Sequence, residues 1–273
     1  MQKSFQIGDN EIAAAPIDPA LYLVATPIGN LADVTLRALQ VLTAADVIAC
    51  EDTRVTRTLL SRYGITGRPV AYHEHNADKA GPKLIAALSQ GQSVALVSDA
   101  GTPLVSDPGY RLVEEALEAG INVVPIPGAS APLAALVASG LPSDSFLFAG
   151  FLPTKDKARR DRLTALAHVP ATLLFFESPR RLATTLNAAV EVLGGDRPAA
   201  VCRELTKLYE EVRRMPLGAL ADHYASADTV KGEIVIAIGP LQETAARMED
   251  AETLLQELLQ VLVAVLTWGK YAP

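Results

Sequence analysis

Cysteine, aromatic residues and long apolar runs are all scarce in this 273-residue chain, and each shortage excludes a class of protein. Two cysteines are too few for a disulfide framework or a cysteine-rich zinc module, and they favour a reducing compartment. The most apolar stretch, residues 258–266, is far shorter than the roughly 20 residues that a membrane-spanning helix needs. Because residues 1–19 also lack the apolar core of a secretory signal, we expect a flexible lead-in there and a soluble, cytoplasmic protein without a membrane segment.

Several catalytic and cofactor-binding motifs are also missing. The chain has neither the G-x-G-x-x-G of dinucleotide-binding proteins nor the G-x-x-x-x-G-K-[ST] of P-loop proteins, and it lacks the G-x-S-x-G of serine hydrolases. His73 and His75 flank Glu74, but neighbouring residues of an extended segment point in alternating directions, so we expect no metal there. Cys50 and Cys202 each end an apolar run, where small buried cysteines are common.

Short apolar runs alternate with amphipathic stretches throughout the chain. The runs lie at 21–26, 46–50, 93–98, 122–127, 146–150, 171–177, 199–204 and 233–239, with a further short one at 70–72. Helical periodicity occupies 35–42, 83–88, 110–119, 159–166 and 181–193. Continuous apolar strands that alternate with helices indicate a mainly parallel sheet covered on both faces. We therefore predict two α/β domains with mainly parallel sheets, residues 20–130 and 131–240, followed by a helical tail at 241–273.

Small and polar residues follow nearly every predicted strand. The segments are PIGN (27–30), EDTR (51–54), HEHN (73–76), DAGTPLVSDPG (99–109) and PGAS (127–130) in the first half, and LPTK (152–155), ESPRR (177–181) and RELTK (203–207) in the second. Ligands of parallel sheets collect outside the carboxyl ends of the strands. These segments on one edge favour a cleft across both domains. The glycines in DAGTP and PGAS favour a small ligand held by backbone groups against an apolar wall.

Charge is distributed unevenly along the chain. The net charge is −7, but residues 151–214 hold 12 Lys/Arg and 8 Asp/Glu, a net of +4, which leaves −11 on the rest. Five cations fall in the nine positions of TKDKARRDR (154–162). An exposed helix start with i,i+4 ion pairs would explain that run. Cations on one edge beside a cleft instead suggest a polyanionic substrate, with nucleic acid as the obvious candidate.

Nine motifs then occur in order: VATPIGNLADVTLRAL, EDTRVTRTLL, HEHN, LVSDAGTPLVSDPG, PGASA, FAGFLPTK, FFESPRRL, CRELTKLYEEV and KGEIVIAIGP. Over about residues 20–240 they closely resemble the ribosomal RNA small subunit methyltransferase I family of the tetrapyrrole-methylase superfamily (class III methyltransferases). The resemblance implies an S-adenosyl-L-methionine-dependent enzyme that methylates the 2′-hydroxyl of a cytidine ribose in the decoding region of 16S rRNA, in the 30S subunit. It also implies a homodimer and a cofactor cleft between two α/β domains.

The resemblance and the charge pattern together select candidate site residues. The resemblance implies that the cofactor contacts Pro27, Ala100, Gly101, Thr102, Pro103, Val105, Ser130, Ala131, Phe176, Glu177, Gly232 and Glu233, while Asp99 either holds the cofactor or orients its loop. The candidates for RNA binding are Arg54, Lys155, Lys157, Arg159, Arg160, Arg180 and Arg181, with 155–162 as the RNA-facing loop. The candidates for assisting deprotonation are Glu177, Arg203 and Glu204, although an ion pair that fixes a loop would equally explain Arg203 and Glu204.

Two features depart from the family, and other functions stay open. The tail 241–273 is acidic and then apolar where relatives continue into a lysine-rich helical element, and Met215-Pro216 replaces an expected Gly-Thr pair. The alternatives are a class III methyltransferase for a tetrapyrrole or a protein, a non-catalytic RNA-binding assembly factor, and a nicotinamide-dependent oxidoreductase. The basic segment 154–162 and the HEHN and ESPRR motifs argue against the first.

Overall fold

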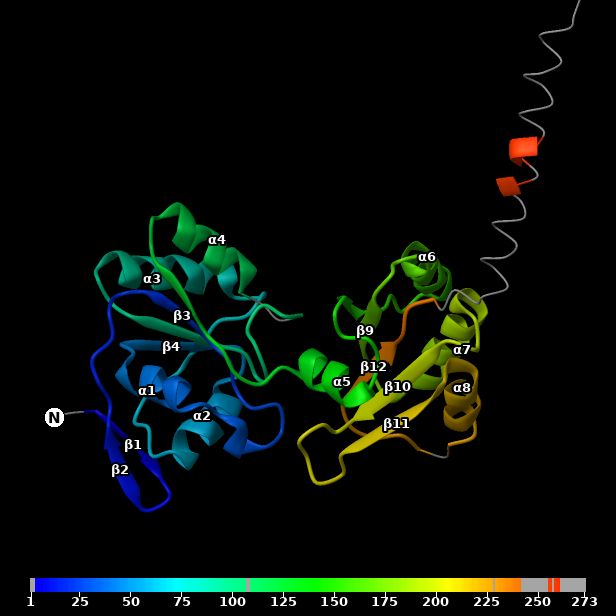
Figure 1. Ribbon diagram of the computed structural model, residues 1–273. Coiled ribbons are helices and arrows are strands. Elements are labelled where there is room, and N and C mark those ends of the chain that lie inside the picture. The colour runs from blue at the N-terminus through cyan, green and yellow to red at the C-terminus, as the bar shows by residue number, and fades with distance from the viewer. Residues whose placement is uncertain (1–2, 107–108, 228, 242–254, 257, 261–273) are drawn as a thin grey trace, which may run out of the picture.

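Two five-stranded sheets, one in each half of the chain, form the framework of the protein (Figure 1). The computed structural model describes residues 3–106, 109–227, 229–241, 255–256 and 258–260. Helix α5 (Ala131–Ser139) lies between the two halves. No helix in these ranges is long and apolar enough to cross a membrane.

The first half is a parallel sheet. Its strands are β3 (Leu21–Val24), β4 (Val47–Cys50), β5 (Val70–Ala71), β6 (Val94–Val97) and β7 (Val123–Ile126), in the spatial order β5-β4-β6-β3-β7. Its helices are η1 (Leu31–Asp33), α1 (Leu36–Ala44), α2 (Thr53–Arg62), α3 (Ala77–Ser89) and α4 (Tyr110–Glu118). Because every pairing is parallel, all five strands end at one edge of the sheet.

Helices cover both faces of this sheet, as its continuous apolar strands require. Helices α1 and α2 pack on one face, and α3 and α4 pack on the other. Strand β6 lies in the middle and is buried at all four positions. Polar caps start the helices: the Thr35 hydroxyl accepts a hydrogen bond from the backbone of Ala38 at 3.1 Å, which satisfies one of the amides that α1 leaves unpaired at its first turn.

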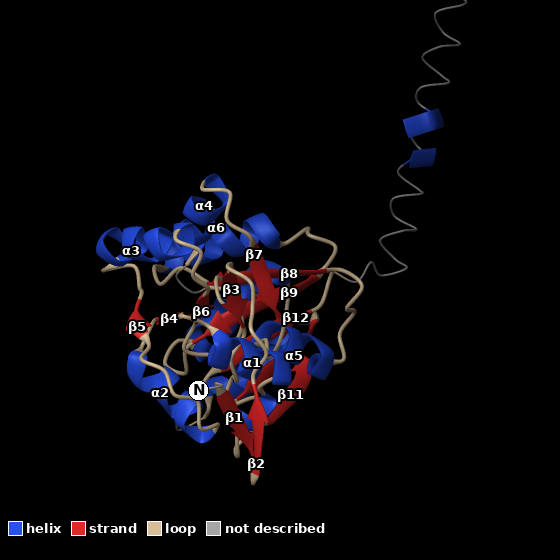
Figure 2. Cartoon of the chain, turned by 90° about the vertical axis from the view of Figure 1, so that its left-hand side faces the viewer, coloured by secondary structure: helices blue, strands red, loops and turns tan. Residues whose placement is uncertain are grey.

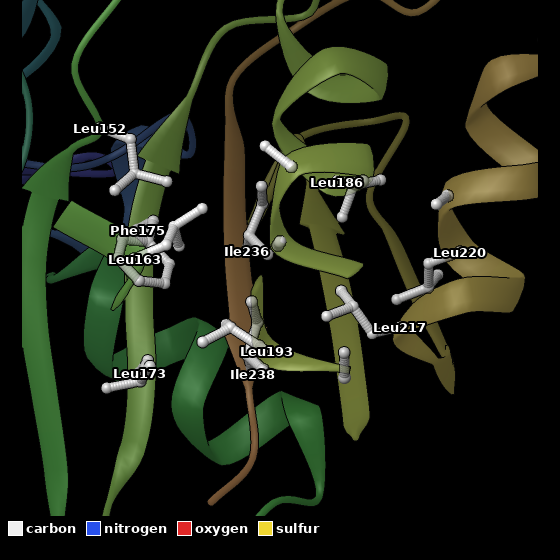
Figure 3. Packing of buried hydrophobic residues seen from close by; sticks show 14 of the residues in the cluster. Leu152, Leu163, Leu173, Phe175, Leu186, Leu193, Leu217, Leu220, Ile236 and Ile238 are labelled. Carbon is white, nitrogen blue, oxygen red and sulfur yellow. The ribbon is translucent and has the colours of Figure 1, made fainter. Parts of the chain in front are cut away.

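The second half carries a mixed sheet. Its strands are β8 (Phe146–Phe151), β9 (Thr172–Glu177), β10 (Pro198–Arg203), β11 (Glu211–Pro216) and β12 (Ile234–Ile238), in the order β11-β10-β12-β9-β8. Its helices are α6 (Asp156–Leu166), α7 (Leu182–Leu193) and α8 (Leu217–Ala225). These three helices cover one face of the sheet and build the core shown in Figure 3, where Leu163, Leu186 and Leu220 face side chains of the strands such as Phe175 and Ile236. Helix α5 covers the other face.

The α/β class is confirmed, but the prediction of a mainly parallel second sheet is wrong. Only β8 and β9 pair in parallel, whereas β9–β12, β12–β10 and β10–β11 are antiparallel. The error has a physical cause. Helices bury both faces of this sheet, so its central antiparallel strands are as continuously apolar as parallel ones.

The prediction of a flexible lead-in over residues 1–19 is wrong for the residues that form a hairpin there. Strands β1 (Ser4–Ile7) and β2 (Asn10–Ala13) pair antiparallel, and Figure 2 shows the hairpin at one end of the first half. Phe5 is buried in the core with side chains of α1 and α2. The backbone N–H of Gln6 donates to the backbone carbonyl of Tyr63 at 2.7 Å. The predicted helical tail, 241–273, lies largely outside the described residues.

Candidate active site

A cavity of about 380 Å³ lies between the two halves of the chain. Its wall is made by the segments that follow β3, β6 and β7 of the first sheet, by the start of α5, and by the ends of β8, β9 and β10 of the second. The segment that precedes β12 completes it. The cavity lies where the polar segments after β3, β6, β7, β9 and β10 predict a cleft, whereas the predicted segments 51–54, 73–76 and 152–155 contribute no residue to its wall.

Hydrogen bonds join the loops of the first half into one wall. The backbones of Thr26 and Gly101 exchange hydrogen bonds of 2.9 and 3.0 Å, and the Thr102 hydroxyl donates to the Ala129 carbonyl at 3.3 Å. Gly101 has a φ of +83°, and a Cβ there would lie 3.3 Å from the Ile28 side chain. Glycine thus allows the backbone at 101 to line the cavity directly.

Two loops at the cavity hold residues in the left-handed region. Positive φ angles occur at Leu104 (71°), Ser106 (64°), Glu204 (51°) and Thr206 (66°). In each loop the residue between the two, Val105 or Leu205, lines the cavity. Such conformations cost about 1–3 kcal/mol each and persist where the surroundings enforce them, which is typical of functional sites.

The antiparallel strand β12 explains how the second half contributes to the same wall. Because β12 lies between β9 and β10 and runs opposite to both, β9 and β10 point the same way and end at one edge. Ile234, at the start of β12, pairs with Glu177 on one side and with Arg203 on the other. The ESPRR and RELTK segments and Gly232 therefore meet despite the mixed topology.

Glu177 lines the cavity, but its carboxylate is held by neighbouring groups. Oε1 accepts from the Ser178 amide at 2.7 Å and lies 3.4 Å from Arg181 Nε, and Oε2 accepts from the Thr185 hydroxyl at 2.6 Å. Arg181 in turn donates to the Leu152 carbonyl at 2.6 Å. These contacts favour a positioning role for Glu177, which fixes the turn after β9 and, through Arg181, the segment after β8.

Arg203 and Glu204, the other candidates for assisting deprotonation, make loop-fixing ion pairs. Arg203 donates twice to Glu211 Oε2 at 3.1 Å, and Glu204 Oε1 accepts from Lys207 Nζ at 2.8 Å. Lys207 also pairs with Glu233 at 3.0 Å. The hydrogen bond from Lys207, with that from the Glu233 amide, holds the pKa of Glu204 below its usual value. Neither Arg203 nor Glu204 is among the residues of the cavity wall.

Most of the predicted cofactor-binding residues do surround the cavity. Those in its wall are Ala100, Gly101, Thr102, Val105, Ser130, Ala131, Phe176, Glu177, Gly232 and Glu233. Pro27, Asp99 and Pro103 lie outside that wall. Pro27 and Pro103 are buried beside it, and Asp99 Oδ1 accepts from the Asp52 amide at 2.9 Å, so Asp99 orients its loop against the start of α2. That arrangement matches the second of the two roles considered for Asp99.

The motifs did not single out several apolar residues of the wall. Ile28 and Leu205 sit inside predicted loops, and Cys202 comes from a strand whose orientation the sequence leaves open. Burial raises the pKa of the Cys202 thiol to about 11, so it is a small apolar wall residue at neutral pH. Phe151 is the least expected wall residue. Regular alternation along β8 would place it on the face covered by α6, α7 and α8, away from the cavity.

The predicted RNA-facing cations separate into exposed and structural ones. Arg159 is 3% exposed and donates to Asp156 at 2.6 Å and to the Thr154 carbonyl, so its assignment to an RNA surface is wrong. Arg160 pairs with Asp156 and Glu191. The half-buried Arg181 pairs with Glu177 and so stabilises the turn after β9. An ion-paired helix start thus explains part of the basic run. Lys155, Lys157, Arg180 and Arg54 are exposed, although Arg54 pairs with Asp52.

Comparison with known proteins first defines the class. The chain matches the profile of the Tetrapyrrole (Corrin/Porphyrin) Methylases over residues 20–221. The crystal structure of uroporphyrin-III-C-methyltransferase from Thermus thermophilus is similar, with a TM-score of 0.58 and 25% identity over 80% of this chain and 93% of that one. The fold is therefore that of a tetrapyrrole-methylase protein.

Sequence relatives define the branch of that class. A protein from Mesorhizobium japonicum named Ribosomal RNA small subunit methyltransferase I is 69% identical over 252 residues, which cover 92% of this chain and 86% of that protein. A protein of the same name from Escherichia coli O157:H7 is 52% identical over 219 residues, 80% of this chain and 77% of that protein. The chain belongs to the ribosomal RNA small subunit methyltransferase I family, as its motifs indicate.

Proposed function

We propose that this protein transfers the methyl group of S-adenosyl-L-methionine to the 2′-hydroxyl of a cytidine ribose in the decoding region of 16S rRNA. One observation carries the proposal: in a chain 69% identical to a named rRNA small subunit methyltransferase, residues from motifs that resemble that family, and that lie far apart in the sequence, line one cavity. The tetrapyrrole alternative is disfavoured, because identity is 69% to a named rRNA methyltransferase and 25% to the porphyrin enzyme.

The residues of the wall suit that cofactor. Apolar side chains such as Ile28, Phe176 and Val235 provide surface for an adenosyl group. The first turn of α5 lies at the wall, and its N-cap Ser130 makes no side-chain capping hydrogen bond, so the partial positive charge of the helix start is available to a carboxylate. Glu177 and Glu233 place carboxylates in the wall, where a sulfonium would meet them, although each is also paired with a cation, Arg181 or Lys207.

Alignment is the main contribution that these residues make to the reaction. When bound, S-adenosyl-L-methionine supplies a methyl group on a positively charged sulfur, which is already activated for displacement. The protein would hold the ribose oxygen in line with that methyl group, so that the O–C bond forms as the C–S bond breaks, S-adenosyl-L-homocysteine leaves and the hydroxyl proton passes to water. Such alignment accounts for a large share of the acceleration. Glu177 acts through the turn it fixes.

An exposed basic surface beside the cavity suits the RNA. Lys155 is the N-cap residue of α6, four residues after Phe151, and the Lys157 side chain is 92% exposed. With Arg162 and Arg180 these residues form a cationic edge on the second half, within the region of net charge +4. We propose that this edge meets phosphates of the small subunit and that the protein acts as a homodimer.

Ribose-methylation mapping of 16S rRNA tests the function. The mapping compares a bacterial strain that lacks its own family member with the same strain carrying this chain. We expect a 2′-O-methyl mark on a decoding-region cytidine to vanish in the first strain and return in the second. Absence of the returning mark, from a chain that is expressed and folded, would contradict the proposal.

A further inference from the structure

Phe151 is an exposed aromatic ring in the wall of the cavity. Its relative exposure is 57%, although it belongs to a strand and follows four half-buried residues. Phe176 lies behind it, with ring centroids 5.4 Å apart and an interplanar angle of 55°. Phe148 also contacts Phe176, in a T-shaped arrangement with ring centroids 4.8 Å apart. The exposed ring is thus supported by a second and a third.

A β-bulge places Phe151 on this face. Phe148 pairs with Leu174, but the next pair is Phe151 with Phe176, so β8 takes three steps where β9 takes two. Gly150 lies within the bulge and has a φ of +64°. In a regular strand Phe148 and Phe151 would point to opposite faces. The bulge instead brings both to the cavity face and sends Leu152 into the core under α6 and α7.

The bulge also contacts the other half of the protein. A Cβ on Gly150 would lie 3.2 Å from the Ser106 hydroxyl, which is part of the strained loop that lines the cavity. Bulges are rare in parallel pairs and typically re-aim a side chain next to an active site. An exposed phenyl ring that requires such a device has a ligand to meet.

We propose that Phe151 stacks on the nucleobase that carries the methylated ribose. The inference rests on the proposed function, and it names the side chain that holds the target nucleotide outside its RNA helix. Proteins that read RNA in this way splay out a base and stack it on an aromatic ring.

Two observations favour the RNA base over the adenine of the cofactor. The ring is the more exposed of the two phenylalanines in the wall, so it lies where an outer ligand enters. Its position is also coupled to the basic edge: Arg181 donates to the carbonyls of Leu152 and Pro153, and the exposed Lys155 follows two residues later. A stacking ring next to cations that meet the backbone is the pattern of single-strand binding.

The chain offers a matched control at the other end of the same strand. Phe146 is 43% exposed and pairs with Thr172, away from the cavity wall. The experiment measures methyl transfer to 30S subunits for wild type, Phe151→Ala, Phe151→Leu, Phe151→Tyr and Phe146→Ala. Calorimetric Kd values for S-adenosyl-L-methionine, thermal unfolding and the oligomeric state are measured on the same preparations.

We expect Phe151→Ala to raise KM for the 30S subunit about 10- to 100-fold, the range of one lost base–aromatic stack. The Kd for the cofactor and the Tm should stay close to wild type. Phe151→Tyr should restore KM, Phe151→Leu should not, and Phe146→Ala should match wild type.

Several results would overturn the inference. A matching rise in the cofactor Kd for Phe151→Ala would place the ring against the cofactor, and full activity of Phe151→Leu would reduce it to a generic apolar wall. A change in the oligomeric state of Phe151→Ala would assign the Phe151 ring to a subunit interface. If wild type methylates 30S subunits and Phe151→Ala does so equally well, the inference alone fails. If wild type methylates no RNA, the proposed function fails and the inference falls with it.

Discussion

The side chain of Lys207 lies directly across Gly29, so that a Cβ on Gly29 would stand 2.4 Å from Lys207 Cγ. Gly29 follows β3 of the first sheet, and Lys207 follows β10 of the second. The Lys207 ammonium group reaches Glu204 and Glu233 at 2.8 and 3.0 Å. A glycine in one half and a lysine in the other therefore set how closely the halves approach beside the cavity.

Replacing Gly29 by alanine should separate this contact from simple backbone strain. Gly29→Ala adds a clash to an unfavourable φ of +153°, and we expect a loss of about 2–4 kcal/mol in the free energy of unfolding. Gly120→Ala is the matched control, because Gly120 has a φ of +70° with open space around it; it should cost only about 1–2 kcal/mol.

Urea unfolding of the double variant Gly29→Ala/Lys207→Ala completes that test. Removing the lysine stem removes the clash, so the alanine at 29 should then cost less than it does beside Lys207, and only the strain of its φ of +153° should remain. An equal cost of Gly29→Ala with and without Lys207 would show that the two residues are not coupled.

The Lys207–Glu204 pair should make stability depend on pH in a defined direction. Hydrogen bonds from Lys207 and from the Glu233 amide lower the pKa of Glu204 below 4.5 in the folded protein. Their contribution is therefore fully present above the pKa of the unfolded state and is lost as pH falls through the folded-state pKa. Lys207→Met should cost about 1 kcal/mol at pH 7, and this difference should shrink below pH ~4.

Urea titrations of wild type and Lys207→Met, at pH 7 and below pH ~4, measure this difference in the free energy of unfolding. The exposed Lys83→Met serves as control and should show a small difference that is independent of pH. A gap between wild type and Lys207→Met that grows on acidification would contradict the assignment.

The basic segment should split into a structural and an RNA-binding part. Arg159→Ala removes a buried cation that holds Asp156 and the Thr154 carbonyl, so we expect a loss of about 2–4 kcal/mol in the free energy of unfolding. Lys155→Gln/Lys157→Gln should change stability by no more than about 0.5 kcal/mol. The lysine pair should instead weaken RNA binding and reduce its salt dependence by about one to two counterions, which filter binding over a range of salt concentrations measures.

Glu177 should tolerate loss of its charge better than loss of its shape. In Glu177→Gln the amide can still meet the Ser178 amide and the Thr185 hydroxyl, so we expect less than about a tenfold fall in kcat and an unchanged pH–rate profile. Glu177→Ala leaves Arg181 and Ser178 without their partner and should cost about 2–4 kcal/mol of stability. A fall of 10³ in kcat for Glu177→Gln, with loss of the acidic limb of the pH–rate profile, would instead identify Glu177 as the general base.

Much of the site could be predicted because its parts are local in sequence. A glycine with positive φ, such as Gly101, and the polar residues that end strands are recognisable from the chain alone. The same is true of the strands themselves, whose apolar runs reflect burial on both faces. The sequence does not predict the hairpin at residues 4–13, because two four-residue strands with one buried side chain carry almost no periodic pattern.

Cations show the limit of sequence reasoning most clearly. Arg159 and Lys157 are equivalent in a charge count, yet Arg159 is 3% exposed and the Lys157 side chain is 92% exposed. Which face of α6 meets α7 decides this difference, and helix packing depends on residues far away in the chain. Net charge therefore predicts a basic region, but it does not tell which of its cations are exposed and which are buried.

By itself, then, the sequence determined the α/β class, the family and the segments that surround the cavity, because burial, turn chemistry and motif spacing are written along the chain. Only the tertiary structure decided the direction of β12, the inward turn of Arg159 and the presence of Phe151 in the cavity wall. Each of these depends on a pairing register or a packed face, which two distant segments define together and neither segment encodes alone.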